Sequence, residues 1–202
     1  MSAYFTEHLA ANRYFDNSFN TEAVKILPGE YFATANNTMI VTVLGSCVSV
    51  CLRDPITRIA GMNHFLLPAN KDELNFNSAS ARYGVYAMEV LVNHLMKLGA
   101  AKQRLEAKVF GGGNVLKQLR INSVGEQNVA FVQEYLKAEK INVLAEDLLG
   151  EFPRKVYFFP LTGEVKVRKL KSLHNTTILD RESEYRVKVN QTPAAGDVDL
   201  FD

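Results

Sequence analysis

The segment between residues 47 and 67 constrains the fold most, because its pattern is that of a β-hairpin. Val48, Val50 and Leu52 alternate with smaller or more polar residues, which is the two-residue period of a strand with two different faces. Asp54-Pro55 follows, and Asp before Pro favours a type I turn. Residues 59–67 are again largely apolar. The segment therefore predicts two antiparallel strands joined by a tight turn.

The rest of the chain adds further strands and two clear helices. Apolar residues recur at three- and four-residue spacing over residues 81–98 and 126–139, which predicts amphipathic helices. Short apolar segments predict strands over residues 31–34, 39–44, 106–110, 141–145, 155–159 and 164–170. Gly45-Ser46 interrupts the strand before the hairpin. We therefore expect an α+β fold, a single layered α/β domain with a mixed, mostly antiparallel sheet and packed amphipathic helices.

The two ends of the chain differ in pattern from its middle. Residues 1–26 mix polar residues with scattered aromatic ones and show no sustained period, so we expect a loosely attached N-terminal arm or irregular cap. Residues 172–202 lose the apolar pattern and end in an acidic stretch, which predicts a polar, flexible C-terminal tail. The main domain is then expected over residues 27–171.

Length and charge exclude several classes of protein. A chain of 202 residues fits one domain and can bury a sizeable core without disulfide bonds. Its formal net charge of +1 is far from the strongly positive charge that is typical of nucleic-acid-binding proteins. No apolar run reaches the roughly 18 residues of a membrane-spanning helix, so we expect no membrane insertion. The N-terminus does not resemble a secretory signal and the chain has only two cysteines, so we expect a reducing, cytoplasmic location.

Cys47 and His64 form the most promising catalytic pair, since the chain offers only two cysteines and four histidines. A histidine beside a cysteine can take the thiol proton, and the thiolate can then attack a carbonyl carbon. The imidazole can later protonate the leaving group. Gly45 and Ser46 can direct backbone N–H groups at the developing oxyanion. The alternative is that Cys47 is a small buried apolar residue and His64 an ordinary strand residue, because free cysteine is among the most buried residue types.

The position of the hairpin loop decides whether these two side chains meet. A loop over residues 54–57, closed by Arg53 opposite Arg58, would set Cys47 directly opposite His64. Cβ atoms of directly opposed residues lie about 4.5–5.5 Å apart, so the side chains would touch. A loop one residue longer or shorter would place a neighbour of His64 there instead.

Two other motifs suit structural roles better than chemistry. Cys51 lies four strand residues from Cys47, about 13 Å at the usual rise. A disulfide needs its Cα atoms within about 7 Å, so we expect neither a disulfide nor a shared zinc site, and Cys51 is interpreted as a packing residue. Gly111-Gly112-Gly113 lacks the features of a P-loop and of a dinucleotide fingerprint. We expect it to form a tight strand-to-helix turn beside the active site.

Several sequence blocks occur in order between about residues 27 and 170, and the first two of them are specific. The blocks are Gly29-Glu30-Tyr31, residues 42–48, residues 61–68, Arg82-Tyr83-Gly84, Ala87-Met88, residues 107–112 and Arg154-Lys155-Val156. Together they resemble the CheD family of chemoreceptor glutamine deamidases. The resemblance implies a three-layer sandwich in which residues 27–171 are the catalytic domain.

The resemblance also implies a reaction. A Cys-His amidohydrolase would convert selected receptor glutamine side chains to glutamate through a cysteine thioester and release ammonia. Cys47 would be the nucleophile, His64 the general base and acid, and Thr42 the third member of the site, with no cofactor and no metal. A regular strand would place Thr42 on the opposite face from Cys47, so only a bulge at Gly45-Ser46 would bring the two together.

Partners follow from the same resemblance. The substrates would be the cytoplasmic helices of chemoreceptors, and a CheC-type phosphatase would be a further partner. The sequence departs from the family at Asp147-Leu148-Leu149-Gly150-Glu151, where the family usually has an Asp followed by a small residue pair ending in glycine, and we expect this to affect partner docking more than chemistry. Two alternatives remain open. The Cys47 thioester could serve acyl transfer or protease-like cleavage, or the protein could be a non-catalytic adaptor that binds chemoreceptors or a CheC-type phosphatase.

Overall fold

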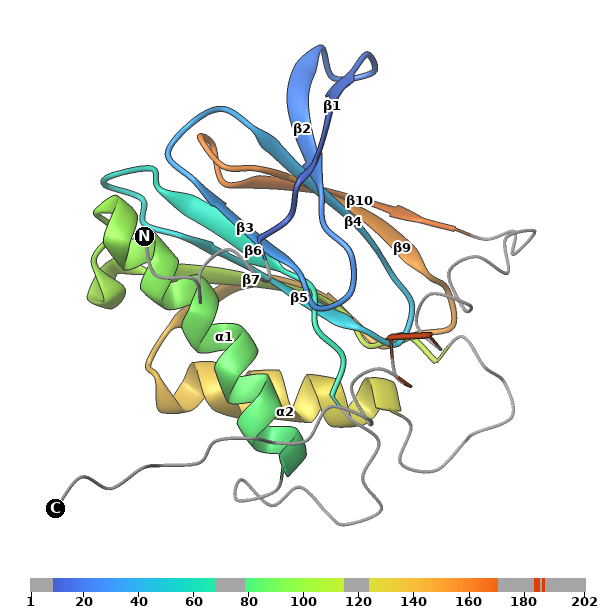
Figure 1. Ribbon diagram of the computed structural model, residues 1–202. Helices are drawn as coiled ribbons and strands as arrows, with labels where there is room; N and C mark the ends of the chain where they lie inside the picture. The colour runs from blue at the N-terminus through green and yellow to red at the C-terminus, as the bar shows by residue number, and fades with distance from the viewer. Residues whose placement is uncertain (1–8, 68–78, 115–123, 171–183, 186, 188–202) are drawn as a thin grey trace, which may run out of the picture.

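The computed structural model describes residues 9–67, 79–114 and 124–170, together with residues 184, 185 and 187 (Figure 1). This part of the chain forms two five-stranded sheets and two α-helices. The first sheet contains, in spatial order, β1 (Asn12–Asp16), β2 (Thr21–Lys25), β4 (Met39–Leu44), β9 (Arg154–Phe159) and β10 (Glu164–Lys169). The second contains β3 (Tyr31–Thr34), β6 (Ala60–Asn63), β5 (Val48–Arg53), β7 (Glu106–Gly111) and β8 (Asn142–Leu148). The helices are α1 (Ala79–Leu98) and α2 (Val124–Ala138), and a 3₁₀ turn, η2 (Lys102–Arg104), precedes β7.

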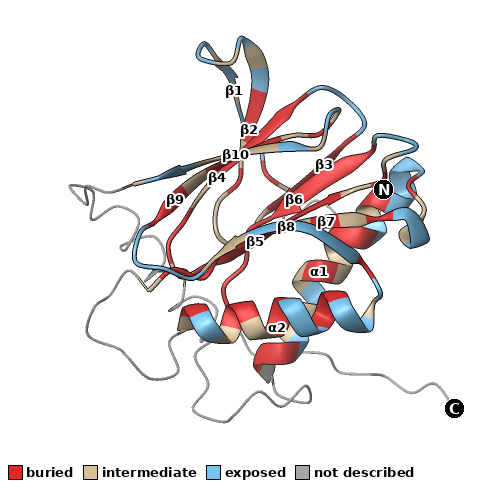
Figure 2. Ribbon diagram, turned by 180° about the vertical axis from the view of Figure 1, so that it is seen from behind, coloured by how far each residue is buried: buried red, intermediate tan, exposed pale blue. Residues whose placement is uncertain are grey.

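The second sheet is the middle one of three layers. On one face, Val48 and Val50 of β5 join a core built with both helices. On the other face, Cys47 and Cys51 pack with Ile40 and other residues of the first sheet. Figure 2 shows the central strands buried and the outer side of α2 exposed. The pairs β2–β4 and β7–β8 are parallel and the other strand pairs are antiparallel, which confirms the predicted mostly antiparallel, layered α+β fold.

The chain crosses from one sheet to the other at Gly45-Ser46. β4 ends at Leu44 in the first sheet, and β5 begins at Val48 in the second. The sequence pattern predicted one interrupted strand here, because both segments are apolar and the pattern does not reveal which sheet each segment joins. The two segments therefore lie in facing layers, and residues on them are not constrained by the side-chain alternation of a single strand.

Residues 12–25 belong to the first sheet and do not form an irregular arm. β1 and β2 make an antiparallel hairpin, and β2 pairs in parallel with β4. Val24 and Ile26 are buried in the core. The prediction of a loosely attached arm is therefore wrong for these residues, because the strand partner of β2 comes from later in the chain. Residues 1–8 and most of the expected C-terminal tail lie outside the described residues.

The β5–β6 hairpin forms, but its register differs by two residues from the predicted one. Arg53 pairs with Ala60 and not with Arg58. The loop is closed by Asp54, whose N–H donates to the Ile59 carbonyl at 2.9 Å, and Arg58 ends it in the left-handed region with φ of 61°. The predicted direct opposition of Cys47 and His64 is therefore wrong.

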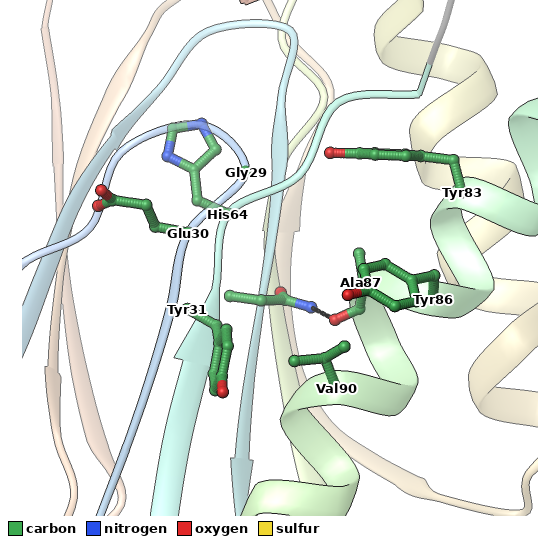
Figure 3. Close-up of a pocket in the computed structure, with 9 residues that line it drawn as sticks. Gly29, Glu30, Tyr31, His64, Tyr83, Tyr86, Ala87 and Val90 are labelled. Atoms are coloured by element: carbon green, nitrogen blue, oxygen red, sulfur yellow. Dashed lines mark hydrogen bonds between the residues drawn. The ribbon is translucent and has the colours of Figure 1, made fainter. Parts of the chain in front are cut away.

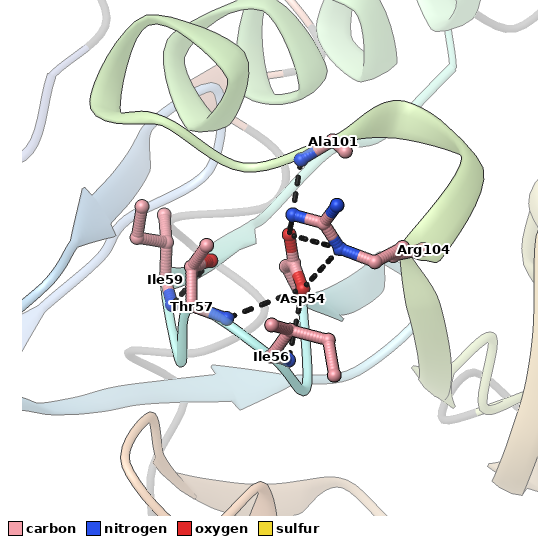
Figure 4. Close-up of polar contacts among 6 residues, drawn as sticks. All are labelled: Asp54, Ile56, Thr57, Ile59, Ala101 and Arg104. Carbon is pink, nitrogen blue, oxygen red and sulfur yellow. Dashed lines mark hydrogen bonds and ion pairs between the residues drawn. The ribbon is translucent and has the colours of Figure 1, made fainter.

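The buried carboxylate of Asp54 fixes this loop (Figure 4). It accepts hydrogen bonds from the N–H groups of Ile56 at 2.9 Å and Ala101 at 3.0 Å, and from Arg104 Nη2 at 2.6 Å. The Arg104 guanidinium holds the pKa of Asp54 well below its usual range, despite the opposing effect of burial. Arg104 lies 50 residues further along the chain, so the hairpin sequence alone did not determine the register.

Candidate active site

Residues 27–30 form a turn that holds the backbone of His64. Glu30 N–H donates to the Leu27 carbonyl at 2.9 Å, and Gly29 has φ of 85° after Pro28, which is a type II turn. Gly29 N–H then donates to the His64 carbonyl at 2.7 Å, and His64 N–H donates to the Glu30 carbonyl at 2.9 Å. The turn thus clamps His64 from both sides, just beyond the end of β6.

Thr42 gives the His64 side chain a defined tautomer. Thr42 Oγ1 lies 2.7 Å from His64 Nδ1 and 2.9 Å from the Ile26 carbonyl oxygen. A carbonyl can only accept and the hydroxyl has one hydrogen, so Thr42 donates to Ile26 and accepts from Nδ1–H of His64. The neutral imidazole then carries its lone pair on Nε2, where a general base needs it. The structure brings Thr42 to His64 across two facing sheets, so no strand bulge is required.

Gly111-Gly112-Gly113 holds the turn that precedes Cys47. Gly112 N–H donates to the Cys47 carbonyl and Gly113 N–H donates to the Gly45 carbonyl, both at 2.7 Å. Gly111 has φ of 117°, and a Cβ there would collide with the Cys47 carbonyl oxygen. Only glycine fits this position. The expected tight turn at the end of β7 is therefore present, and it lies directly against the segment that carries Cys47.

Asn128 of α2 connects the turn before Cys47 to the chain after His64. Its Nδ2 donates to the Ser46 carbonyl at 2.9 Å, and its Oδ1 accepts from Leu67 N–H at 2.8 Å. The sequence analysis missed this residue. A signal was present, because Asn128 occupies the apolar face of its helix, where a polar amide needs an explanation.

Cys47 and His64 lie on the same face of the second sheet, between the two sheets. The observed register sets Cys47 opposite Leu66 and leaves His64 on the diagonal, two residues away along the neighbouring segment. Diagonal neighbours have Cα atoms about 7–8 Å apart, which is still within reach of a long side chain. The imidazole is directed toward the first sheet, where Thr42 holds it.

A small pocket lies beside His64, between β3 and α1 (Figure 3). Its polar lining includes Glu30, Asn63 and Tyr83. The Tyr83 hydroxyl points across the pocket toward His64. Burial, followed by the nearby Cys47 thiol, raises the pKa of Tyr83 well above its usual value, so this phenol keeps its proton at neutral pH. Sequence analysis placed Tyr83 in a family block but assigned it no role.

Tyr185 contacts two residues that line this pocket, Gly29 and Tyr83. Its hydroxyl forms a hydrogen bond with the Tyr83 hydroxyl. Its ring lies against Gly29, where a Cβ would fall 2.6 Å from the ring atom Cε2. Cys47 has an exposed fraction of 0% and His64 of 2%. In this arrangement the two side chains are closed to a protein substrate.

The second cysteine, Cys51, is buried in the core between the two sheets. Cys47 and Cys51 form no disulfide within the described residues, and burial raises the pKa of the Cys51 thiol far above its usual value. Within the described ranges, no group of three or more His, Cys, Asp or Glu residues could hold a metal ion. The helices in those ranges are also too short or too polar to span a bilayer.

Sequence comparisons identify the family. A family model described as CheD chemotactic sensory transduction matches residues 66–169. A Shewanella oneidensis protein named "Probable chemoreceptor glutamine deamidase CheD 1" is 63% identical over 94% of this chain and 93% of its own length. The chain belongs to the CheD family.

Other CheD relatives match along the whole chain. A Dechloromonas aromatica protein with the same printed name is 54% identical over 100% of both chains. A Methylobacillus flagellatus protein named "Probable chemoreceptor glutamine deamidase CheD" is 56% identical over 96% of this chain and 97% of its own. Among solved structures, that of the Bacillus licheniformis hypothetical protein YfiH aligns with a TM-score of 0.38 and 14% identity over 59% of this chain and 51% of that chain. That likeness is too low to carry an argument.

The segment that departs from the CheD pattern lies beside the triglycine turn. Leu149 is held at φ of 60°, with 40% of its surface exposed. Its N–H donates to the Gly111 carbonyl at 2.8 Å, and its carbonyl accepts a hydrogen bond from the buried guanidinium of Arg154. Asn114 N–H donates to the Gly150 carbonyl at 2.8 Å. An apolar side chain is therefore fixed at the surface near the site, and its expected effect on partner docking stays a prediction.

Proposed function

We propose that this CheD-family protein is a chemoreceptor glutamine deamidase that converts selected receptor glutamine side chains to glutamate and releases ammonia. The observation that carries the proposal is the hydrogen-bonded chain from the Ile26 carbonyl through Thr42 to His64, on the sheet face that Cys47 shares. It orients the lone pair of a neutral imidazole on Nε2, as a thiol hydrolase needs. The relatives whose printed names include this activity match nearly the whole chain.

The first half of the proposed reaction forms a thioester. His64 Nε2 takes the proton of the Cys47 thiol, and the sulfur attacks the amide carbon of the glutamine side chain. A C–S bond forms as the carbonyl π electrons move to oxygen. When the tetrahedral intermediate collapses, the C–N bond breaks and the imidazolium of His64 gives its proton to the departing nitrogen. Ammonia leaves, and the acyl group remains on Cys47.

The second half consumes one water molecule. His64 Nε2 takes a proton from the water, whose oxygen attacks the thioester carbon. The C–S bond breaks, the sulfur regains a proton from His64, and the product is a glutamate side chain. Thr42 accepts Nδ1–H of His64 throughout, so the same ring nitrogen handles every proton. The backbone N–H groups around Gly45 and Ser46 are the proposed oxyanion donors.

Substrate access requires a change at the pocket. Because Cys47 and His64 are buried, the Tyr83–Tyr185 contact must separate before a glutamine side chain can reach the thiol. The proposed substrates are the cytoplasmic helices of chemoreceptors, and the proposed location is the cytoplasm. A CheC-type phosphatase is the further proposed partner. A non-catalytic adaptor would bind the same helices without converting them.

Conversion of a receptor signalling fragment tests the proposal. Wild-type protein should convert specific glutamines to glutamate, as mapped by peptide mass spectrometry, and Cys47→Ala should not. Cys51→Ala is the matched control, since it removes the other buried thiol and should keep the activity. Binding of the fragment without conversion by the wild type would favour the adaptor. Conversion by Cys47→Ala at the wild-type rate would contradict the mechanism.

A further inference from the structure

We propose that Asn128 is a positioning residue for this reaction, which holds the Ser46 carbonyl so that the Cys47 N–H is aimed at the forming oxyanion. The inference rests on the proposed function, because it takes Cys47 as the nucleophile. It assigns a role in the reaction to a side chain of α2, an element that contributes none of Cys47, His64 and Thr42.

The amide of Asn128 is fully buried and makes two directed hydrogen bonds. Its Oδ1 accepts from Leu67 N–H at 2.8 Å, and its Nδ2 donates to the Ser46 carbonyl at 2.9 Å. The opposite orientation would set oxygen against the Ser46 oxygen and nitrogen against the Leu67 N–H, so only this one satisfies both partners. A leucine could fill the same space on an apolar helix face. The two hydrogen bonds therefore explain why the residue is polar.

The Ser46 carbonyl and the Cys47 N–H belong to one peptide group. None of the described peptide bonds is cis, and in a planar trans peptide the C=O and N–H bonds point in opposite directions. Anchoring the Ser46 carbonyl toward α2 thus directs the Cys47 N–H away from α2. The Gly45 carbonyl, held by Gly113 N–H, orients the preceding N–H of Ser46 in the same manner. Such fixed backbone donors stabilise a tetrahedral oxyanion without reorganisation.

The start of α2 lies unusually close to the triglycine turn, which brings Asn128 within reach. A Cβ at Gly125 would lie 2.5 Å from the Gly112 carbonyl oxygen, so the two backbones are in direct contact. Asn128 follows on the same helix face, almost one turn later. From there it reaches both the segment before Cys47 and the segment after His64. It therefore fixes the backbone spacing between the two reacting side chains.

Two reactions of the same thiol separate this role from a merely structural one. Deamidation builds up an oxyanion, whereas alkylation by iodoacetamide displaces iodide at carbon and does not. Asn128→Leu fills the same space without adding a charge, and it removes the donor to the Ser46 carbonyl together with the acceptor for Leu67 N–H. It should lower kcat for the receptor fragment about 10²-fold, as expected for loss of an oxyanion donor. KM and the alkylation rate of Cys47 should stay at the wild-type level.

Asn93→Leu is the matched control, because it makes the same chemical change on an exposed turn of α1 and should leave kcat unchanged. Asn128→Ala, checked by circular dichroism, provides a second folded variant and should show the same split between the two reactions. Equal losses of alkylation and deamidation would overturn the proposal. Unfolding of both Asn128 variants would also overturn it, because Asn128 would then only anchor α2. Absence of conversion by the wild type would instead refute the proposed function.

Discussion

Two thiols point into the same core between the sheets. Cys47 lies directly before β5, and Cys51 is the fourth residue of that strand. Cys51 lies inside a regular ladder, where it pairs with Met62 on one side and Lys108 on the other. Cys47 lies just before the strand begins, in a turn whose carbonyls are held by Gly112, Gly113 and Asn128. Both are buried, so burial does not distinguish them. The difference lies in the polar groups that the irregular segment places around Cys47.

The largest expected difference is in thiol reactivity. Cys47 should be alkylated by iodoacetamide at least about 10²-fold faster than Cys51 at pH 7.5, because His64 can take the proton of Cys47, whereas Cys51 lies within the regular β5 ladder, where burial raises its pKa and suppresses its thiolate. His64→Ala should slow Cys47 and leave Cys51 unchanged. Peptide mass spectrometry after timed quenching measures both thiols in one sample. Equal rates would show that the polar surroundings of Cys47 do not activate it.

Removing the acceptor for His64 should have the next largest effect. Thr42→Val is nearly isosteric, so packing is kept, while Nδ1–H loses its partner and the useful tautomer is no longer favoured. We expect kcat for the receptor fragment to fall on the order of 10²-fold, a loss within the range for general acid–base catalysis. Thr42→Ser restores the hydroxyl and is the matched control. An unchanged kcat in Thr42→Val would remove Thr42 from the mechanism.

A substitution at Asp54, in the loop of the β5–β6 hairpin, should lower the stability of the fold without changing the rate of the reaction. Asp54→Asn removes the charge of a buried carboxylate whose ion-pair partner, Arg104, is 41% exposed, and should lower the free energy of unfolding by about 2 kcal/mol at pH 7, within the range for hydrogen bonds to a charged group. The folded-state pKa of Asp54 lies below the unfolded value of about 3.9, so the carboxylate stabilises the fold above that pH and loses this effect as the pH falls.

Urea unfolding at pH 7 and pH 3 measures this dependence. The difference between wild type and Asp54→Asn should shrink at the lower pH. Asp16→Asn, at the end of β1, keeps the Oδ1 acceptor for Ser18 N–H and should have a small effect at both. kcat of Asp54→Asn, measured below its melting temperature, should match the wild type. A stability difference that grew on acidification would contradict the assigned sign.

The smallest expected effect concerns access to Cys47. Tyr185→Ala removes the side chain that lies on Gly29 and Tyr83, so alkylation of Cys47 should become several-fold faster. Cys51 in the same sample reports any general loosening and should not change. Tyr14→Ala, which shortens a half-buried tyrosine of β1, is the control. A Cys47 rate unaffected by Tyr185→Ala would show that other parts of the chain limit access.

Local patterns predicted much of this molecule, and long-range contacts account for what they missed. The hairpin and the helices follow from the alternation of apolar residues, and the proposed catalytic pair follows from the small number of cysteines and histidines. The register was wrong because Arg104 holds Asp54 across 50 residues of sequence. Thr42 looked misplaced because one apolar stretch supplies strands to two sheets. β2 showed no period of its own, since a parallel pairing with β4 places it in the core.

The hydrogen bonds of Asn128 also bear on when the thiol becomes reactive during folding. Their partners are far from Asn128 in the sequence, since Leu67 lies 61 positions before it and Ser46 lies 82 positions before it. The turn before Cys47 therefore acquires its shape only after α2 has docked. The chain loses conformational entropy when it closes loops of this length, and this loss comes before the hydrogen bonds can stabilise the fold. These contacts therefore form late in folding. A chain emerging from the ribosome carries Cys47 and His64 long before α2 is synthesised. The nascent chain should therefore hold an ordinary cysteine, and amidase chemistry should begin only when the fold is complete.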